Sequence, residues 1–209
     1  MNKKNALIIV LVCGTVWGCV EAGLGLIPEY PFSSVLPTLI GFMILALART
    51  YLPQPGSSTS IGAIAMLYRA TTAGAWACHL WAVLLVGVSF DIVATLVGKR
   101  SKVEAWRSIA GAISAYLAYA SFALTMTYVM IHVPPVAGCA HWWIVIGAPK
   151  ILDHVAISGS LAAIGASISV PLGYMLSSPV ERFSYVRSKP AFVGAMSLTA
   201  LLWIVAIVF

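Results

Sequence analysis

Residues 76–98 read WACHLWAVLLVGVSFDIVATLVG, and this stretch decides the class of the protein. Its one acidic residue is Asp91, and about 20 largely apolar residues are enough for a helix to cross the hydrocarbon core of a membrane. Lys99, Arg100 and Lys102 follow the stretch, and basic residues concentrate in the cytoplasmic loops of membrane proteins. The stretch therefore predicts a transmembrane helix that ends in the cytoplasm.

The composition extends this prediction to the whole chain of 209 residues. Hydrophobic residues make up 61% of it and charged residues 9%, with a mean hydropathy of +0.98, whereas a soluble domain carries about 25% charged residues. So few charges exclude a soluble enzyme, a nucleic-acid binder and a disordered chain. The net charge of +6 is accordingly interpreted as an orientation signal within a lipid bilayer.

Six further apolar segments accompany the first. With it they lie at about 5–27, 32–52, 61–72, 76–98, 106–131, 152–176 and 190–209. The third segment contains Arg69 and is short for a full crossing, and residues 53–60 before it are expected to form a turn. We predict an all-α integral membrane protein, a compact bundle of about seven transmembrane helices, with a main domain at 1–178 and an additional loop and helix at 179–209.

The basic residues predict the orientation. If the N-terminus lies in the cytoplasm and the third segment crosses, ten of the twelve basic residues fall on the inner side, Arg49 among them. The two exceptions are Arg69 and Lys150. This bias predicts seven crossings with the C-terminus outside, and it marks the ten inner charges as solvated loop residues without chemistry.

Most of the remaining polar groups gather toward the predicted outer side. A charge in the hydrocarbon core costs roughly 2.5 kcal/mol or more and is usually paired, near water or functional. Convergent polar groups beside aromatic walls are what a small-molecule site needs. The candidate substrate-binding residues are Glu21, Arg69, Trp76, His79, His141, Trp142, Lys150 and Asp153.

Several of these residues also have structural interpretations. Glu21 and Arg69 could simply pair to hold helices together, and Trp142 could anchor the chain at the membrane interface. Asp153 could only favour the start of its helix. Asp91 could be a hydrogen-bond acceptor that joins helices, or a proton or gating group.

A face of small residues on the first segment offers a packing surface. Gly14, Gly18 and Ala22 share one side of the predicted helix, and such faces let helix backbones approach closely in lipid. The face could pack within the bundle or dock a partner membrane protein. Periodicity does not separate these two possibilities.

The motifs of common enzymes are absent from the sequence. It contains no HExxH, GxSxG or phosphate-binding GxxxxGK[ST] pattern, so we expect no catalytic residue, and active transport would need a separate ATPase or an ion gradient. The four histidines, His79, His132, His141 and His154, have no recognised metal-ligand spacing. We therefore expect no metal or cofactor, although a haem- or metal-binding redox protein remains an alternative.

Taken together, several segments resemble a known family. They are GFMILALAR at 41–49 with PQPG at 53–56, IGAIA at 61–65, GVSFD at 87–91, and GSLAAIGA at 159–166 with PLGY at 171–174. This organisation resembles, over about residues 5–178, the substrate-binding S components of energy-coupling factor transporters. Those are small, basic, roughly six-helix proteins that bind vitamins or related micronutrients from outside.

The resemblance implies a function and partners. The chain would be a substrate-binding subunit for micronutrient uptake in the cytoplasmic membrane of a prokaryote, working with a transmembrane T subunit and cytoplasmic ATPases. Gly14, Gly18 and Ala22 would contact the T subunit, where alanine is usual in the family. The seventh segment is a further departure, and a structural subunit of a larger membrane complex remains a third possibility.

Overall fold

The chain folds into helices in the computed structural model, which describes residues 3–24, 32–72, 77–98, 103–132, 143, 145–182 and 189–208. No strand occurs among these residues. The elements are α1 (Lys3–Leu24), α2 (Phe32–Tyr51), α3 (Ser57–Thr71), α4 (Ala77–Val97), α5 (Glu104–Tyr128), the 3-10 turn η2 (Met130–His132), α7 (Ala148–Asp153), the π-helical turn η4 (His154–Gly159), α8 (Ser160–Arg182) and α9 (Lys189–Val208). The predicted all-α class is confirmed for this part of the chain.

Five of the described segments are long and apolar enough to cross a membrane, which indicates a multi-pass membrane protein. These segments are Asn5–Leu24, Ser34–Tyr51, Ala77–Val97, Glu104–Tyr128 and Ala148–Ser177. The 15-residue α3 is shorter than a full span, and the apolar part of α9 is limited to Met196–Val208. The count of seven crossings and the orientation therefore stay predictions.

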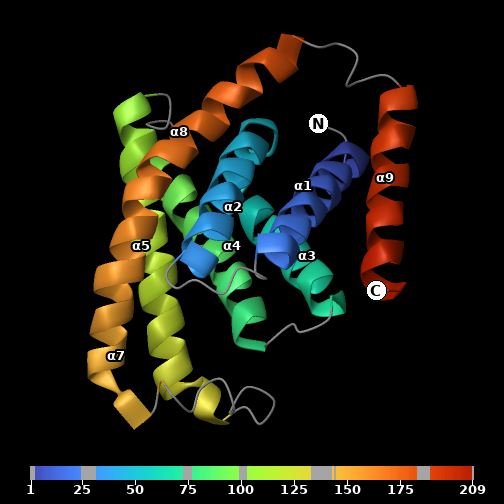
Figure 1. The fold of residues 1–209 in the computed structure, drawn as a ribbon. Helices are drawn as coiled ribbons and strands as arrows, with labels where there is room; N and C mark the ends of the chain where they lie inside the picture. The colour runs from blue at the N-terminus through green and yellow to red at the C-terminus, as the bar shows by residue number, and fades with distance from the viewer. Residues whose placement is uncertain are drawn as a thin grey trace.

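Successive long helices run in alternating directions. The helices α1, α3, α5 and α9 point one way, and α2, α4 and α8 point the other (Figure 1). The short α3 packs mainly against α1 and α4, while α8 packs against α2 and α5. The third segment thus runs along the bundle between two longer neighbours, which shield its more polar surface.

Glycines set the close approach of several helix pairs. A β-carbon at Gly14 or Gly18 of α1 would lie 2.6 Å from Ile64 Cβ or 2.7 Å from Tyr68 Cβ of α3, respectively. Helices in lipid associate through such tight packing because lipid supplies no hydrophobic drive between them. The large, fully buried side chains between the helices include Trp17, Phe42, Leu45, Ile61 and Phe90.

One local prediction needs correction. Residues 57–60 were expected to belong to a turn, but the turn ends at Gly56, whose φ of 87° suits glycine, and the serines that follow open α3. Pro149 occupies the first turn of α7, where proline is tolerated because no helical hydrogen bond needs its nitrogen.

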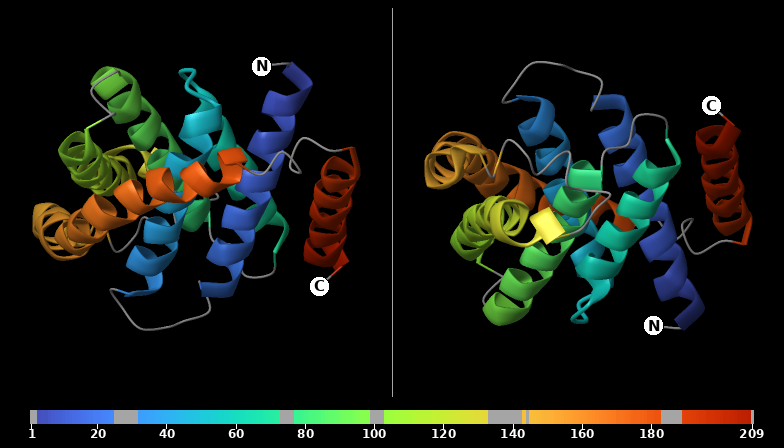
Figure 2. Two further views of the ribbon diagram at one scale, coloured as in Figure 1. Left: turned by 90° about the horizontal axis from the view of Figure 1, so that it is seen from above. Right: turned by 90° about the horizontal axis from the view of Figure 1, so that it is seen from below.

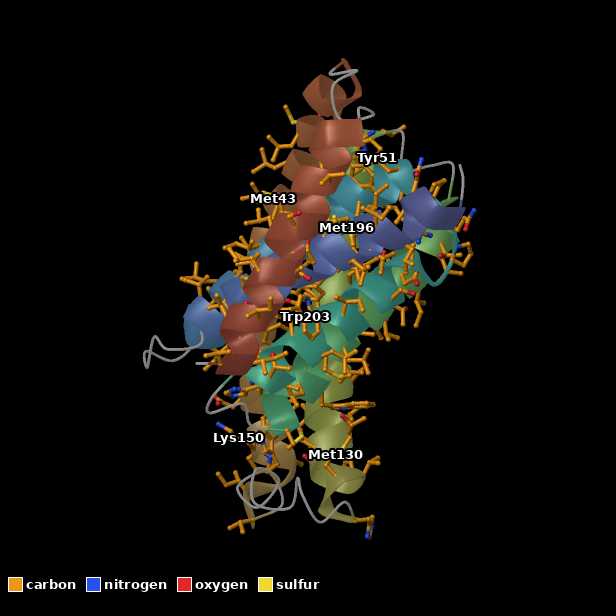
Figure 3. All side chains as sticks on the ribbon, turned by 90° about the vertical axis from the view of Figure 1, so that its right-hand side faces the viewer. Met43, Tyr51, Met130, Lys150, Met196 and Trp203 are labelled. Carbon is orange, nitrogen blue, oxygen red and sulfur yellow. The ribbon has the colours of Figure 1, made fainter. Side chains whose placement is uncertain are left out.

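The last helix lies at one flank of the bundle, beside α1 and α3 (Figure 2). Trp203 Nε1 donates a hydrogen bond to Thr15 Oγ1 of α1 at 2.9 Å, and the Tyr68 hydroxyl of α3 donates to the Leu202 carbonyl at 3.2 Å. The rings of Tyr68 and Trp203 also meet edge to face, with centroids 5.4 Å apart. The position of Trp203 on α9 is visible in Figure 3. Specific polar contacts therefore hold α9 against the bundle.

Candidate functional site

The described candidate residues lie at one end of the bundle, where α1, α3 and α5 end and α4 and α7 begin. We call it the α5–α7 end. It carries Glu21, Arg69, His79, Lys150 and Asp153, and in Figure 3 Lys150 and Met130 mark it, opposite Tyr51. Trp76, His141 and Trp142 lie outside the described residues. The described candidates fall into two groups, one on α1, α3 and α4 and one on α7, and their union in a single substrate site stays a prediction.

The first group at this end is built around Arg69. This residue is only 5% exposed, and its Nη1 donates to Thr72 Oγ1 at 2.9 Å. Its positive charge acts on both the Glu21 carboxyl group and the exposed His79 imidazole. Among the described residues no ion pair within 4.0 Å joins Glu21 to Arg69, so the direct pairing considered above is not formed.

Glu21 is held from its own helix. Trp17 Nε1 donates to Glu21 Oε1 at 3.0 Å, one helical turn away, and the Trp17 ring is fully buried against Gly41 of α2. The indole therefore fixes one carboxylate oxygen of Glu21, since Trp17 itself has no freedom to move. Glu21 and Arg69 form a pair of opposite charges that are near each other without contact.

The second group lies on α7. Lys150 Nζ is 3.8 Å from Asp153 Oδ2, and the two side chains are 31% and 46% exposed. An exposed ion pair of this kind contributes about 0–1 kcal/mol to stability. Lys150 Nζ also lies 5.8 Å from the centre of the Trp143 ring, within the range of a cation–π interaction. Both charges remain accessible to a bound molecule.

His154 occupies an enclosure of aromatic rings beside this second group. Its ring stacks on Tyr119 with centroids 5.1 Å apart and an interplanar angle of 26°, and it meets Trp143 edge to face at 5.0 Å. Phe122 closes a third side at 5.7 Å. We call His154, Tyr119, Phe122 and Trp143 the aromatic enclosure.

The imidazole of His154 is a buried polar group in an apolar bundle. The residue is 8% exposed, and three aromatic rings surround it. Ionisable side chains buried in a membrane domain are rare and mark functional sites. His154 is therefore a candidate recognition group.

The sequence did not single out the aromatic enclosure. His154 was considered only as a potential metal ligand, and Tyr119 and Phe122 were not considered. Their spacing of three residues, which places two aromatic rings on one helix face, was the available signal. The π-helical turn that directs His154 toward them leaves no trace in the hydrophobic pattern.

A sulfur-rich cluster supports the enclosure from the side of α4. Met126 and Met130 are buried and contact Trp81, Phe122 and Trp143, and Trp81 Nε1 donates to Thr125 Oγ1 at 2.8 Å. Methionine adapts readily to irregular aromatic surfaces. The cluster joins the start of α4 to the end of α5 and to Trp143.

The opposite end of the bundle corrects one prediction. Arg49, expected among the solvated loop charges, is 8% exposed and pairs with Asp91, with Nη1 2.7 Å from Oδ1. Arg49 also donates to the Gln54 carbonyl and to Thr95 Oγ1, and Asp91 Oδ2 accepts from Thr59. The Asp91 carboxylate thus joins α2, α3 and α4, as the helix-joining interpretation proposed.

The small-residue face of α1 is used within the chain at two of its three positions. Gly14 and Gly18 are buried against α3, and Ala22 is half-buried. This placement favours the packing interpretation for the two glycines. Within the described part of the chain, no three His, Cys, Asp or Glu side chains are grouped so that they could hold a metal ion.

Comparison of the chain with models of protein families, with curated proteins and with solved structures gives no significant match. The functional argument therefore starts from the arrangement of residues at the α5–α7 end.

Proposed function

We propose that this protein is a membrane-embedded substrate-binding subunit for the uptake of a small micronutrient, and that the α5–α7 end receives the substrate. The observation that supports this most is the presence, at one end of an apolar bundle, of a buried arginine and a buried histidine beside accessible charges. Burying an ionisable group in a membrane domain costs free energy, and such groups are characteristic of substrate sites.

The candidate residues supply complementary chemistry. The guanidinium of Arg69 or the ammonium of Lys150 would hold an anionic group of the substrate, as charge-assisted hydrogen bonds are the strong ones. The carboxylates of Glu21 and Asp153 would accept from its donors, together with His79, and His141, Trp76 and Trp142 belong to the same proposal. The aromatic enclosure adds flat surfaces for a planar part of the molecule.

Uptake requires an energy source that this sequence does not contain. In the proposed arrangement a transmembrane T subunit and cytoplasmic ATPases supply it, in the cytoplasmic membrane of a prokaryote, with the N-terminus inside and the α5–α7 end outside. The seven helices, with α3 and α9 crossing, belong to this proposal. Support comes from the basic residues, ten of which fall on the opposite side from this end in that orientation.

Purification of the full chain in a mild detergent tests the proposal. Mass spectrometry should find a bound small molecule together with a membrane protein and ATPases. If the molecule is acidic, Arg69→Gln should weaken its binding at least tenfold, since a hydrogen bond to a charged group contributes about 1.5–3 kcal/mol. Glu104→Gln, an exposed change in the first turn of α5 at the other end, should leave binding unchanged. A chain that recruits neither ligand nor ATPases contradicts the proposal.

A further inference from the structure

The aromatic enclosure is filled by a residue of the protein itself. The imidazole of His154 lies nearly parallel to the Tyr119 ring at 5.1 Å, and Trp143 stands edge-on against it at 5.0 Å. A second flat ring cannot stack on that face of Tyr119 while His154 occupies it. Any planar ligand that uses the enclosure must therefore take the place of His154.

The helix that precedes His154 lies at the surface of the bundle. α7 has no buried residue, and its Leu152 is 70% exposed. In contrast, Ser158 and Gly159 of η4 and Ala162 of α8 are buried. His154, which directly follows α7, is the first buried residue of this segment, and its ring packs against Tyr119, Phe122 and Trp143.

Both ends of α7 carry a conformational feature that permits movement. At its C-terminal end, η4 is π-helical, which places one extra residue in the turn, and such turns are frequent at functional sites. At its N-terminal end, Gly147 has a φ of 66°, a conformation that costs glycine little. A change of η4 to α-helical geometry would rotate α7 relative to α8 by about 100°, the turn of one helical residue.

We propose that α7 is a lid over the substrate site and that His154 is its latch. In the latched state His154 fills the aromatic enclosure. When η4 changes to α-helical geometry, His154 leaves Tyr119, a planar ring of the substrate takes its place, and Lys150 and Asp153 move with α7. This inference rests on the proposed function only in assigning the substrate to the α5–α7 end.

Hydrogen exchange of the full chain in lipid nanodiscs tests the latch without a substrate. In His154→Ala, the amides of residues 150–153 should exchange at least fivefold faster than in the unchanged protein, while those of 161–170 in α8 keep their rates. The control is His132→Ala, which removes an exposed imidazole at the end of α5 and should change neither segment. Equal exchange at 150–153 in His154→Ala and the unchanged protein would overturn the latch.

Nuclear magnetic resonance of labelled histidine tests the hinge. Stacking on Tyr119 should shift the His154 imidazole signals strongly upfield, and the four histidines of the chain can be assigned by substitution. Deleting Ile157, which is 46% exposed, removes the extra residue of η4 and should abolish the upfield shift, whereas Ile157→Ala keeps the residue count and the shift. A folded deletion variant that retains the shift overturns the hinge.

If the deletion variant does not fold, exchange in the unchanged protein decides the hinge. The amides of 155–158 should then exchange at least fivefold faster than those of 161–170, and equal protection overturns it. None of these measurements involves a substrate, a T subunit or an ATPase. The latch can therefore fail while ligand binding succeeds, and the reverse outcome is equally recognisable.

Discussion

At the scale of single residues, the buried ion pair of Arg49 and Asp91 depends strongly on the hydrogen bonds around it. Their side chains are 7% and 6% exposed, so neither charge has bulk water to stabilise it. Arg49 Nη1 and Nη2 reach Ser57 Oγ and Thr95 Oγ1 at 3.1 and 2.8 Å, and the Thr59 backbone N–H adds a bond to Asp91 at 3.3 Å. These bonds satisfy both partners only while α2, α3 and α4 stay together.

Removing one partner should therefore cost more than removing both. We expect Asp91→Leu to lower the free energy of unfolding by about 3–5 kcal/mol, because it leaves a buried guanidinium unpaired. The double variant Arg49→Met with Asp91→Leu should recover a large part of that loss. Reversible unfolding in detergent measures both values, with Glu104→Gln as an exposed carboxylate control. A double variant as unstable as the sum of the single ones would contradict this account.

At the scale of helices, glycine positions determine how closely elements approach. A β-carbon at Gly111 of α5 would collide with the carbonyl group of Ala166 in α8, and one at Gly173 of α8 would collide with that of Met43 in α2. Backbone atoms cannot rotate away as a side chain does. The α2, α8 and α5 layer is thus held at its spacing by residues without side chains.

Gly111→Ala should destabilise the protein by about 1–3 kcal/mol, the usual cost of overpacking a tight interface. Its matched control is Gly23→Ala in α1, where a β-carbon would meet nothing within 4 Å. That change should be neutral or slightly stabilising, since alanine favours a helix over glycine by about 1 kcal/mol. Thermal unfolding of the two variants gives the comparison, and equal midpoints would contradict it.

The attachment of α9 can be measured in the same way. A double-mutant cycle of Trp203→Phe and Thr15→Val should give a coupling energy of about 0.6 kcal/mol, the average for interhelical hydrogen bonds in a membrane. Val208→Ala, a change at a 67% exposed position of α9, should show no coupling with Thr15→Val. A coupling energy of zero between Trp203 and Thr15 would mean that this hydrogen bond does not stabilise the attachment of α9.

At the scale of the whole molecule, one labelling experiment tests which end of the bundle faces the cytoplasm. In a variant whose four cysteines are replaced, we introduce Gln54→Cys or His132→Cys, two exposed positions at opposite ends of the bundle. A membrane-impermeant maleimide should label the cysteine at position 132 in intact cells and the one at position 54 only after permeabilisation. The reverse labelling would invert the predicted topology.

Much of the molecular architecture was predictable because apolar length alone marks a membrane helix. The five long segments fall close to their expected ranges. The ends of α1 and α3 and the start of α4 carry Glu21, Arg69 and His79, respectively. Contacts across the bundle were not predictable. Arg49 and Asp91 are 42 residues apart, and hydropathy carries no information on which faces of two helices meet.

The aromatic enclosure shows a second limit of the sequence. An uninterrupted α-helix through residues 148–182 would direct His154 to another side, and the added residue of η4 changes this direction. Hydrophobic periodicity near 3.6 residues does not reveal a single turn with a different period. Site residues that depend on such local irregularity need the three-dimensional structure.

The pair of Arg49 and Asp91 also bears on how the chain is made. During synthesis α2 and α3 emerge from the ribosome before α4, so Arg49 and Thr59 reach the membrane ahead of their acidic partner. An aspartate in an inserting segment is disfavoured, by about 2.5–3.5 kcal/mol at the centre of the helix and by less toward its end. The charge of Asp91 therefore opposes the otherwise strong hydropathy of α4. The α2–α3 hairpin therefore offers Asp91 its ion pair with Arg49 and its hydrogen bond from Thr59 as soon as α4 leaves the translocon.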